Sequence, residues 1–261
     1  MILDEIAAKT RNRVEASKKK ISPEQMKAEA EALNADTGFP FEEKLKQPGV
    51  SFICEVKKAS PSKGVIAPDF DYLSIAREYE SAGADAMSIL TEPDYFLGSI
   101  DYLREIAAKV HSIPLLRKDF TIDEYMIYEA KVAGASVVLL ICVLLDEETL
   151  RRYIGICDCL GLSALVEAHD EAEIEKAVRA GARIIGVNNR NLKDFTVDIH
   201  NGIRLRKKVP KDILFVAESG IQTREDIVEL EQGKVNAVLI GETFMRSPDK
   251  NAMLQKLRGK E

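Results

Sequence analysis

Five apolar segments of this sequence end in charged or amide side chains that a buried strand would not ordinarily carry. These side chains are Glu55 with Lys57, Lys118, Glu167, Asn188 and Glu218. A desolvated ion costs several kcal/mol unless it is paired, so a fold seldom repeats that cost without a use for it. Two lysines beside three carboxylates could serve as proton donors and acceptors around a small cavity. The alternative is a structural ion-pair network that closes one end of the fold.

Apolar segments recur along the chain with helical patterns between them. From residue 50 they fall near 52–57, 86–90, 114–118, 137–141, 163–167, 184–188, 213–217 and 236–240. Gly83, Gly134, Gly181 and Gly233 each stand where a helix would end, which is the usual place of a C-cap glycine. Eight such β-then-α units predict a (β/α)8 TIM barrel, with strands that are apolar on both faces as in a parallel sheet.

The alternative α/β architecture is a doubly wound open sheet, which usually carries a glycine-rich loop after its first strand. Residues 59–64 (ASPSKG) lack that pattern, so we expect the closed barrel. Before it, Ile2, Ile6 and Val14 could line one helix face, and Ser22-Pro23 is typical of the start of a second helix. We therefore predict one domain over 1–261, with a helical extension (1–47) packed on the barrel core (48–261).

Composition excludes several classes of protein. The net charge of −6 disfavours nucleic-acid binding, and the 46% apolar content is ample for a core. The acidic start does not resemble a signal peptide, and no stretch approaches the roughly 20 apolar residues that cross a membrane. We expect a cytoplasmic protein with reduced core cysteines and no bound metal, because its three histidines lack ligand spacing. We also expect a monomer, because a closed barrel leaves no unit without a partner.

In such a barrel the carboxyl ends of the strands meet at one face, where active sites form. Glu55 and Lys57 are two residues apart, so they point the same way, and we assign that direction as inward. Small residues in 218–220 (ESG) and 240–243 (IGET) follow the last two strands, a common place for phosphate. The alternative for these glycines is ordinary turn geometry.

These residues lie in motifs that resemble the indole-3-glycerol phosphate synthase family. The motifs, in order, are 55–64 (EVKKASPSKG), 88–92 with 95–99 (SILTE, YFLGS), 116–120 (LRKDF), 165–169 (LVEAH), 188–192 (NNRNL), 217–221 (AESGI) and 239–242 (LIGE). The resemblance covers the whole chain. It implies ring closure, decarboxylation and dehydration of 1-(2-carboxyphenylamino)-1-deoxyribulose 5-phosphate to indole-3-glycerol phosphate in tryptophan biosynthesis. It implies neither a cofactor nor a metal, and a small phosphorylated substrate as the partner.

The resemblance also implies catalytic roles. Lys118 is the general acid for the ribulose carbonyl, and we expect burial or the neighbouring Lys57 to lower its pKa. Lys57 and Glu167 are the second acid and the base, with the division between them left open. Glu55 and Asn188 orient the amine and hydroxyls of the substrate, and Glu55 could hold both lysines in place.

The remaining roles concern binding. Arg190 and Glu218 contact the substrate, and the anthranilate ring is walled by Phe96, Phe120 and Leu192, which could instead simply pack the loops. Ser219 is expected to have a catalytic role and also to bind phosphate. The other phosphate-binding groups are Ser60, Gly220, Gly241 and the backbone N–H of Glu242. Thr243 could add its hydroxyl, and residues 60–64 have the composition of a mobile flap.

Two other functions stay open at this point. Phosphoribosylanthranilate isomerase shares the expected fold but is expected to need a cysteine and an aspartate, whereas Cys54 should face away from the mouth. A non-catalytic phosphosugar-binding barrel would be free to lose Lys118 or Glu167, yet both stand in their motifs.

Overall fold

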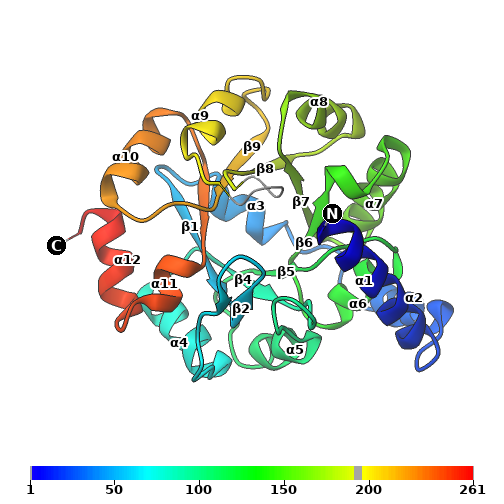
Figure 1. Cartoon of the computed structure of the whole chain (residues 1–261). Coiled ribbons are helices and arrows are strands. Elements are labelled where there is room, and N and C mark those ends of the chain that lie inside the picture. Colours follow the sequence, from blue (N-terminus) through cyan, green and yellow to red (C-terminus); the bar gives the residue numbers. More distant parts are fainter. Residues whose placement is uncertain (1, 191–195, 261) are drawn as a thin grey trace.

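The computed structural model describes residues 2–190 and 196–260 and has a closed parallel barrel at its centre (Figure 1). Its strands are β1 (Ser51–Val56), β4 (Ala86–Leu90), β5 (Leu115–Lys118), β6 (Val137–Ile141), β7 (Ser163–Ala168), β8 (Ile184–Asn188), β9 (Leu214–Glu218) and β10 (Ala237–Ile240). Strand β1 pairs in parallel with both β4 and β10, which closes the sheet. The barrel is therefore confirmed, the open sheet is wrong, and each predicted strand boundary lies within one residue of the observed one.

Helices cover the outside of the barrel (Figure 1). They are α4 (Tyr72–Ala82), α5 (Ile100–Ala107), α6 (Tyr125–Val132), α7 (Glu147–Cys159), α8 (Glu171–Ala180), α9 (His200–Arg206), α10 (Arg224–Gln232), α11 (Glu242–Arg246) and α12 (Lys250–Arg258), with the 3-10 turn η1 (Cys142–Leu144) after β6. Outward side chains of the strands and inward side chains of these helices form one core layer. Cys54 belongs to that outer layer, as expected.

A second core fills the inside of the barrel. Inward residues such as Ile53, Leu116 and Leu165 form it together with Phe41 and Leu45. The last two belong to α3 (Pro40–Leu45), a short helix that the sequence pattern did not predict. Its two apolar side chains are fully buried among the inward strand residues, so α3 acts as a plug in the barrel.

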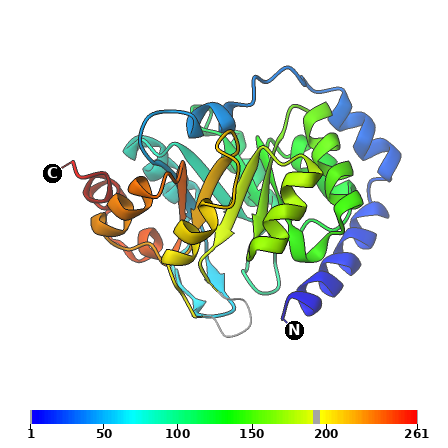
Figure 2. The ribbon, with the colours of Figure 1, turned by 90° about the horizontal axis from the view of Figure 1, so that it is seen from above.

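The N-terminal extension contains α1 (Ile2–Lys18) and α2 (Pro23–Glu31). Figures 1 and 2 both show these helices beside α6 and α7, on the opposite side of the barrel from α12. Ser22 caps α2 as predicted, because its hydroxyl accepts a hydrogen bond from the backbone of Gln25. The predicted face of α1 needs one correction, since Leu3 is buried with Ile6 and Val14 whereas Ile2 is only half-buried.

The helix C-caps follow the prediction at three glycines and depart from it at the fourth. Gly83, Gly134 and Gly181 have φ values of 81°, 88° and 91°. Gly233 instead has φ −70°, and the left-handed residue is Lys234 at φ 63°. A Cβ on Gly233 would press on the Ile203 side chain at 3.3 Å, so close packing rather than a left-handed turn requires this glycine.

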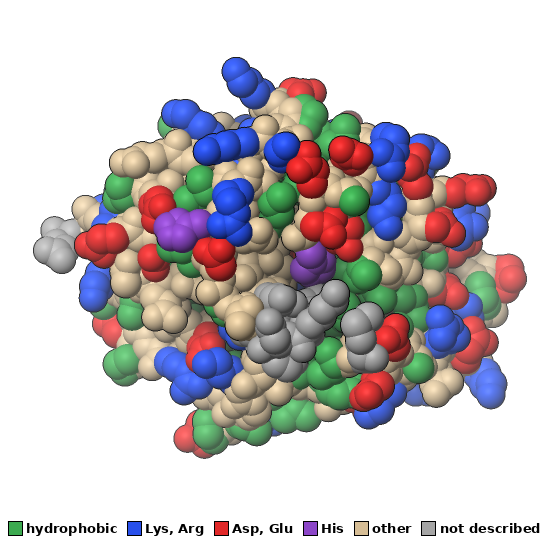
Figure 3. Space-filling model, turned by 45° about the horizontal axis from the view of Figure 1, so that its top comes forward, with side chains coloured by type: hydrophobic (Ala, Val, Ile, Leu, Met, Phe, Trp, Pro, Cys, Tyr) green, Lys and Arg blue, Asp and Glu red, His purple; other side chains and the backbone are tan. Residues whose placement is uncertain are grey.

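The surface agrees with the composition. Basic and acidic side chains are interspersed over the face drawn in Figure 3. Among residues 2–190 and 196–260, no helix has both the length and the apolar character of a membrane span.

Candidate active site

A cavity of about 1160 Å³ opens at the carboxyl ends of the barrel strands. It is lined by all the predicted site residues that the structure describes: Glu55, Lys57, Ser60, Phe96, Lys118, Phe120, Glu167, Asn188, Arg190, Glu218, Ser219, Gly220, Gly241 and Glu242. Leu192 lies outside the described residues. Strand register explains the convergence, because Asn188 lies beside Glu218 and Glu167 lies beside Gly186 in neighbouring strands.

Lys118 lies among the carboxylates of this cavity. Its Nζ is 2.9 Å from Glu218 Oε2 and 3.4 Å from Glu167 Oε2, and only 14% of its side chain is exposed. Lys57 forms a separate pair with Glu55, with Nζ and Oε2 2.5 Å apart. These ion pairs also agree with the alternative of a structural ion-pair network that closes one end of the fold. They line a cavity, however, and do not fill it.

Two glycines make room for this cluster. A Cβ on Gly186 would collide with the Glu218 carboxylate, and a Cβ on Gly241 would collide with the Glu55 carboxylate and the Lys57 ammonium. Gly186 occupies an inward position of β8, and Gly241 directly follows β10. Small residues on β8 and after β10 therefore provide the space that the charged groups of neighbouring strands require.

The pKa of Lys118 contradicts the expectation from sequence. Burial lowers this pKa, but the negative charges of Glu218, Glu167 and Glu55 more than offset it, so the pKa lies above its usual value. The expectation failed because it weighed burial and Lys57 without the two carboxylates that contact Lys118. Lys118 is therefore firmly protonated and acts as a hydrogen-bond donor.

The two carboxylates beside Lys118 differ from each other. Burial raises the pKa of Glu167, but Lys118, His169 and Asn188 together lower it to about 2. Burial is the main reason that the pKa of Glu218 rises to about 7, with a contribution from the charge of Glu167. Glu167 is thus available as a base, whereas Glu218 titrates near neutrality.

The loops after β9 and β10 form another part of the cavity wall. Ser219 and Gly220 both have left-handed backbones, with φ 69° and 82°. The Glu242 side chain turns toward cations, since its Oε1 lies 3.0 Å from Arg246 and 3.6 Å from Lys63. The Thr243 hydroxyl donates to the Ile221 carbonyl, so it is not the free donor that the sequence suggested.

Residue Ser60 lies in a small antiparallel ribbon, where the sequence suggested a loop. The ribbon pairs β2 (Ala59–Ser60) with β3 (Gly64–Val65). Ser60, Lys63 and Ile66 from this segment all line the cavity. The ribbon therefore borders the same space as the loops after β9 and β10.

Apolar groups line a further part of the cavity. The rings of Phe96 and Phe120 are 6.0 Å apart between centroids. Ile2 and Ile6 of α1 also line the cavity, so the extension contributes to its wall. The Arg190 guanidinium lies 4.0 Å from the carboxylate of Glu242, which directly follows β10 and Gly241.

Three buried polar residues around the site carried no role in the sequence prediction. The Glu92 carboxylate accepts hydrogen bonds from the backbone N–H groups of residues 94–96, next to Phe96. Asn189 donates to the Ser219 carbonyl. Asp119, directly after Lys118, accepts from Arg13 of α1 at 2.7 Å and from Thr91 at 2.6 Å.

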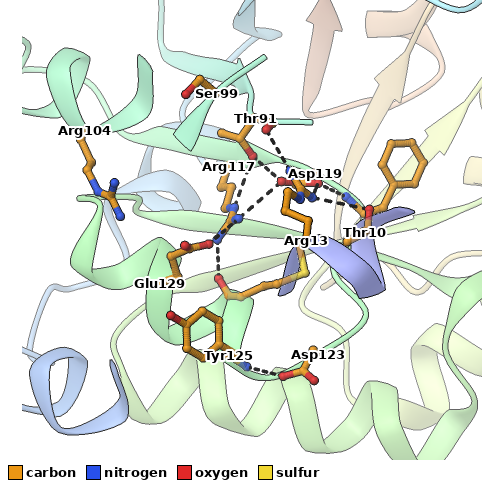
Figure 4. Close-up of polar contacts among 12 residues, drawn as sticks. Thr10, Arg13, Thr91, Ser99, Arg104, Arg117, Asp119, Asp123, Tyr125 and Glu129 are labelled. Carbon is orange, nitrogen blue, oxygen red and sulfur yellow. Dashed lines mark hydrogen bonds and ion pairs between the residues drawn. The ribbon is translucent and has the colours of Figure 1, made fainter. Parts of the chain in front are cut away.

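Figure 4 shows the Asp119 network, in which Arg117 also takes part. The Arg117 guanidinium lies 3.4 Å from Asp119 and 2.8 Å from Glu129 of α6. The sequence did carry one signal for this network, because the charged residues Arg117 and Asp119 flank Lys118. Strand alternation turns Arg117 outward when Lys118 points inward.

Among the described residues, no group of three or more His, Cys, Asp or Glu side chains is arranged to hold a metal ion. The fold and the cavity define a (β/α)8-barrel enzyme whose buried lysines and carboxylates lie beside an apolar wall and glycine-containing loops of the kind that bind phosphate. The profile of the indole-3-glycerol phosphate synthase family matches residues 3–257. This chain belongs to that family, whose members are carboxy-lyases of tryptophan biosynthesis that act on a small phosphorylated substrate.

Curated relatives support the assignment. The chain is 60% identical to an indole-3-glycerol phosphate synthase of Ruminiclostridium cellulolyticum, covering 99% of each chain. It is 53% identical to the enzyme of the same name from Leuconostoc mesenteroides, covering 100% of each. Both matches extend through the N-terminal extension as well as the barrel.

Solved structures with low sequence identity share the fold. A 3-hexulose-6-phosphate synthase has a TM-score of 0.66 at 13% identity, covering 81% of this chain and 99% of that one. A phosphoribosylanthranilate isomerase of Thermotoga maritima has a TM-score of 0.57 at 14% identity, covering 80% and 99%. The isomerase prediction therefore has support from the fold alone, and the family assignment replaces it.

Proposed function

We propose that the ring-closing reaction of the family proceeds in this chain with Lys118 as the acid that activates the ribulose carbonyl. The observation that carries this proposal is the ammonium of Lys118 inside the cavity, held by Glu218 at 2.9 Å and Glu167 at 3.4 Å. Its raised pKa ensures that the proton is present when the substrate arrives. A substrate oxygen that displaces one carboxylate would receive a strong, charge-assisted hydrogen bond.

The first step forms a carbon–carbon bond. The ring carbon that bears the carboxylate attacks C2′ of the ribulose chain, and Lys118 protonates the carbonyl oxygen to a hydroxyl. The bond to the carboxylate then breaks, carbon dioxide leaves, and its electron pair restores the aromatic ring. An apolar wall of Phe96 and Phe120 favours this loss, because a charged carboxylate becomes an uncharged product.

The second step removes water. Lys57 donates a proton to the departing C2′ hydroxyl, and Glu167 takes the proton from C1′ as the five-membered ring becomes indole. The pKa of Glu167, about 2, keeps its carboxylate ionised, which is the form that can accept a proton. Lys57 directly follows β1 and lines the cavity beside Glu55, which supports its assignment as the second acid.

Binding groups occupy the rest of the cavity in this proposal. Backbone N–H groups of residues 219–220 and 241–242 hold the phosphate, with Ser60 opposite. Arg190 contacts the anthranilate carboxylate, and Asn188 and Glu55 orient the amine and the hydroxyls. We further propose that the enzyme acts as a monomer, since all these groups come from one chain.

The test replaces Lys118 by methionine, which keeps the length of the side chain but removes its proton. We expect kcat for release of carbon dioxide and indole fluorescence to fall by about 10²–10⁴-fold. Binding of the substrate reduced at C2′, measured by calorimetry, should stay close to that of the wild type.

Lys46→Met is the matched control, because Lys46 is exposed at the end of α3 and does not line the cavity. It should leave both measurements unchanged. Full activity in Lys118→Met would remove Lys118 as the acid.

A further inference from the structure

The turn after β9 has a backbone conformation that most side chains disfavour. Ser219 and Gly220 have φ values of 69° and 82°, and a positive φ is uncommon for a residue other than glycine. Both residues line the cavity. As far as the structure describes the chain, the backbone N–H groups of Ser219 and Gly220 donate to no other protein group. Contacts at other atoms of the turn therefore hold its conformation.

Asn189 makes such contacts, through two consecutive carbonyl groups of the turn. Its side-chain Nδ2 donates to the Ser219 carbonyl at 3.1 Å, and its backbone N–H donates to the Glu218 carbonyl at 2.8 Å. Asn189 is 3% exposed and does not line the cavity, although its neighbours Asn188 and Arg190 do. It therefore contacts the turn from outside the cavity.

The peptide group links these carbonyl contacts to the directions of the N–H groups. All described peptide bonds are trans, so each carbonyl and the N–H of the next residue point in opposite directions. Holding the Ser219 carbonyl toward Asn189 therefore turns the Gly220 N–H away from Asn189. Holding the Glu218 carbonyl does the same for the Ser219 N–H. The directions of both N–H groups thus depend on Asn189.

The Asn189 amide is itself fixed by the start of α9. Its Oδ1 accepts a hydrogen bond from the Gly202 N–H at 2.9 Å, and its backbone carbonyl accepts from the Asp198 N–H at 3.0 Å. A backbone N–H only donates and a backbone carbonyl only accepts, so the amide oxygen faces Gly202 and the amide nitrogen faces Ser219. A Cβ on Gly202 would come within 3.0 Å of that oxygen. The amide is therefore held in one orientation from both ends.

We propose that Asn189 is a positioning residue that orients the N–H groups of Ser219 and Gly220 toward the phosphate of the substrate. This inference rests on the phosphate site proposed above, and it adds a residue outside the cavity on which the affinity of that site depends. The Thr243 hydroxyl holds a different carbonyl, that of Ile221, so it does not replace this contact. Hydrogen bonds weaken steeply when they are misaligned, so an N–H group without a fixed direction binds phosphate less strongly.

The test replaces Asn189 by leucine, which has a similar shape but donates no hydrogen bond to Ser219. Calorimetry compares two ligands, the substrate reduced at C2′ and the same compound without its phosphate. We expect the affinity for the phosphorylated ligand to fall by about 10-fold or more, and the affinity for the other ligand to stay unchanged. KM for the substrate should rise with little change in kcat, because the phosphate is bound equally in the ground state and the transition state.

Asn236→Leu is the matched control. Asn236 also holds β9 through its side chain, since its Oδ1 accepts from the Phe215 N–H at 2.9 Å. This contact lies at the other end of the strand from Ser219, and Asn236 does not line the cavity. Asn236→Leu should lower the stability of the fold and leave both affinities unchanged. If Asn189→Leu does not fold, Asn189→Ala removes the same donor without crowding and is measured in the same way.

An unchanged affinity for the phosphorylated ligand in the Asn189 variant would overturn the inference. So would an equal loss for both ligands, or the same selective loss in Asn236→Leu, since either pattern indicates a general structural effect.

The wild-type protein separates this inference from the proposed function. A wild type that binds the two ligands equally well would contradict the phosphate site itself. A wild type that prefers the phosphorylated ligand, beside an Asn189 variant with the same preference, would contradict the role of Asn189 alone.

Discussion

Within the cavity, the single ammonium of Lys118 lies between the two carboxylates of Glu167 and Glu218. Lys118 contacts both Glu167 and Glu218, but the pKa of Glu167 is lowered to about 2 while burial raises that of Glu218 to about 7. Glu218 Oε1 is buried and has no hydrogen-bond partner in the described part of the chain. The charge of the cavity therefore changes near neutral pH through Glu218.

This predicts a pH dependence of ligand binding. As pH rises through about 7, Glu218 loses its proton, and the added negative charge opposes an anionic ligand. We expect the affinity for the substrate reduced at C2′ to weaken by roughly 10-fold across this change. In Glu218→Gln, which stays neutral, calorimetric titrations should give a flatter profile.

The phosphate of the ligand titrates equally in both experiments, so the difference between the two proteins isolates Glu218. Parallel profiles in the wild type and the variant would contradict this account of the charge.

At the scale of elements, α1 is tied to the loops that carry the reacting groups. Arg13 donates to the Asp119 carboxylate at 2.7 Å and to the Thr91 carbonyl at 3.1 Å, so it joins the loops after β5 and β4. Asp119 directly follows Lys118 in the chain. We therefore expect the position of Lys118, the proposed acid, to depend on the contact between Arg13 of the N-terminal extension and Asp119.

Replacing Arg13 by alanine should affect both stability and turnover. Asp119 is buried, so losing its partner should lower the free energy of unfolding by about 1–3 kcal/mol. kcat should fall as well, because the loop next to Lys118 loses a fixed contact. Denaturant unfolding and the product assay would measure the two effects.

Lys18→Ala is the matched control, since Lys18 of the same helix pairs with the more exposed Asp123 at 2.7 Å. It should cost at most about 1 kcal/mol and leave kcat unchanged. Equal losses in the two variants would show that α1 has only a general structural effect.

At the scale of the whole molecule, two concentric cores share one set of strands. Alternate strand residues face either the helices or the interior, and α3 adds Phe41 and Leu45 to the interior core. The extension packs its own apolar residues, including Val14 and Met26, into the outer core. We therefore propose that the chain unfolds as a single domain.

Truncating Phe41 tests this proposal. Phe41→Ala should leave an unfilled space in the interior core and lower the free energy of unfolding by about 3–5 kcal/mol. Because the layers share strands, circular dichroism and tyrosine fluorescence should report one shared transition. The exposed Leu33 offers the control Leu33→Ala, expected to be neutral; two separate transitions in Phe41→Ala would argue against a single domain.

Much of the fold and of the candidate site was predictable because strand patterns are local. A run of apolar residues that ends in Glu167 or Lys118 indicates both a buried strand and the end that carries the polar group. Period-two alternation then separates Lys118, which points inward, from Arg117, which points outward. The α3 plug was missed because its six residues are too few to give a helical pattern.

The sequence by itself determined the order of the β-then-α units and which side chains stand at the strand ends, because both depend on near neighbours along the chain. Only the tertiary structure decided the charge state of Lys118, the contact of Arg13 with Asp119, and the contact of Glu167 with His169. Those properties depend on groups that lie up to 106 positions apart in the chain and meet only when the barrel closes. Burial and Coulomb interactions act through space, so no local pattern encodes them.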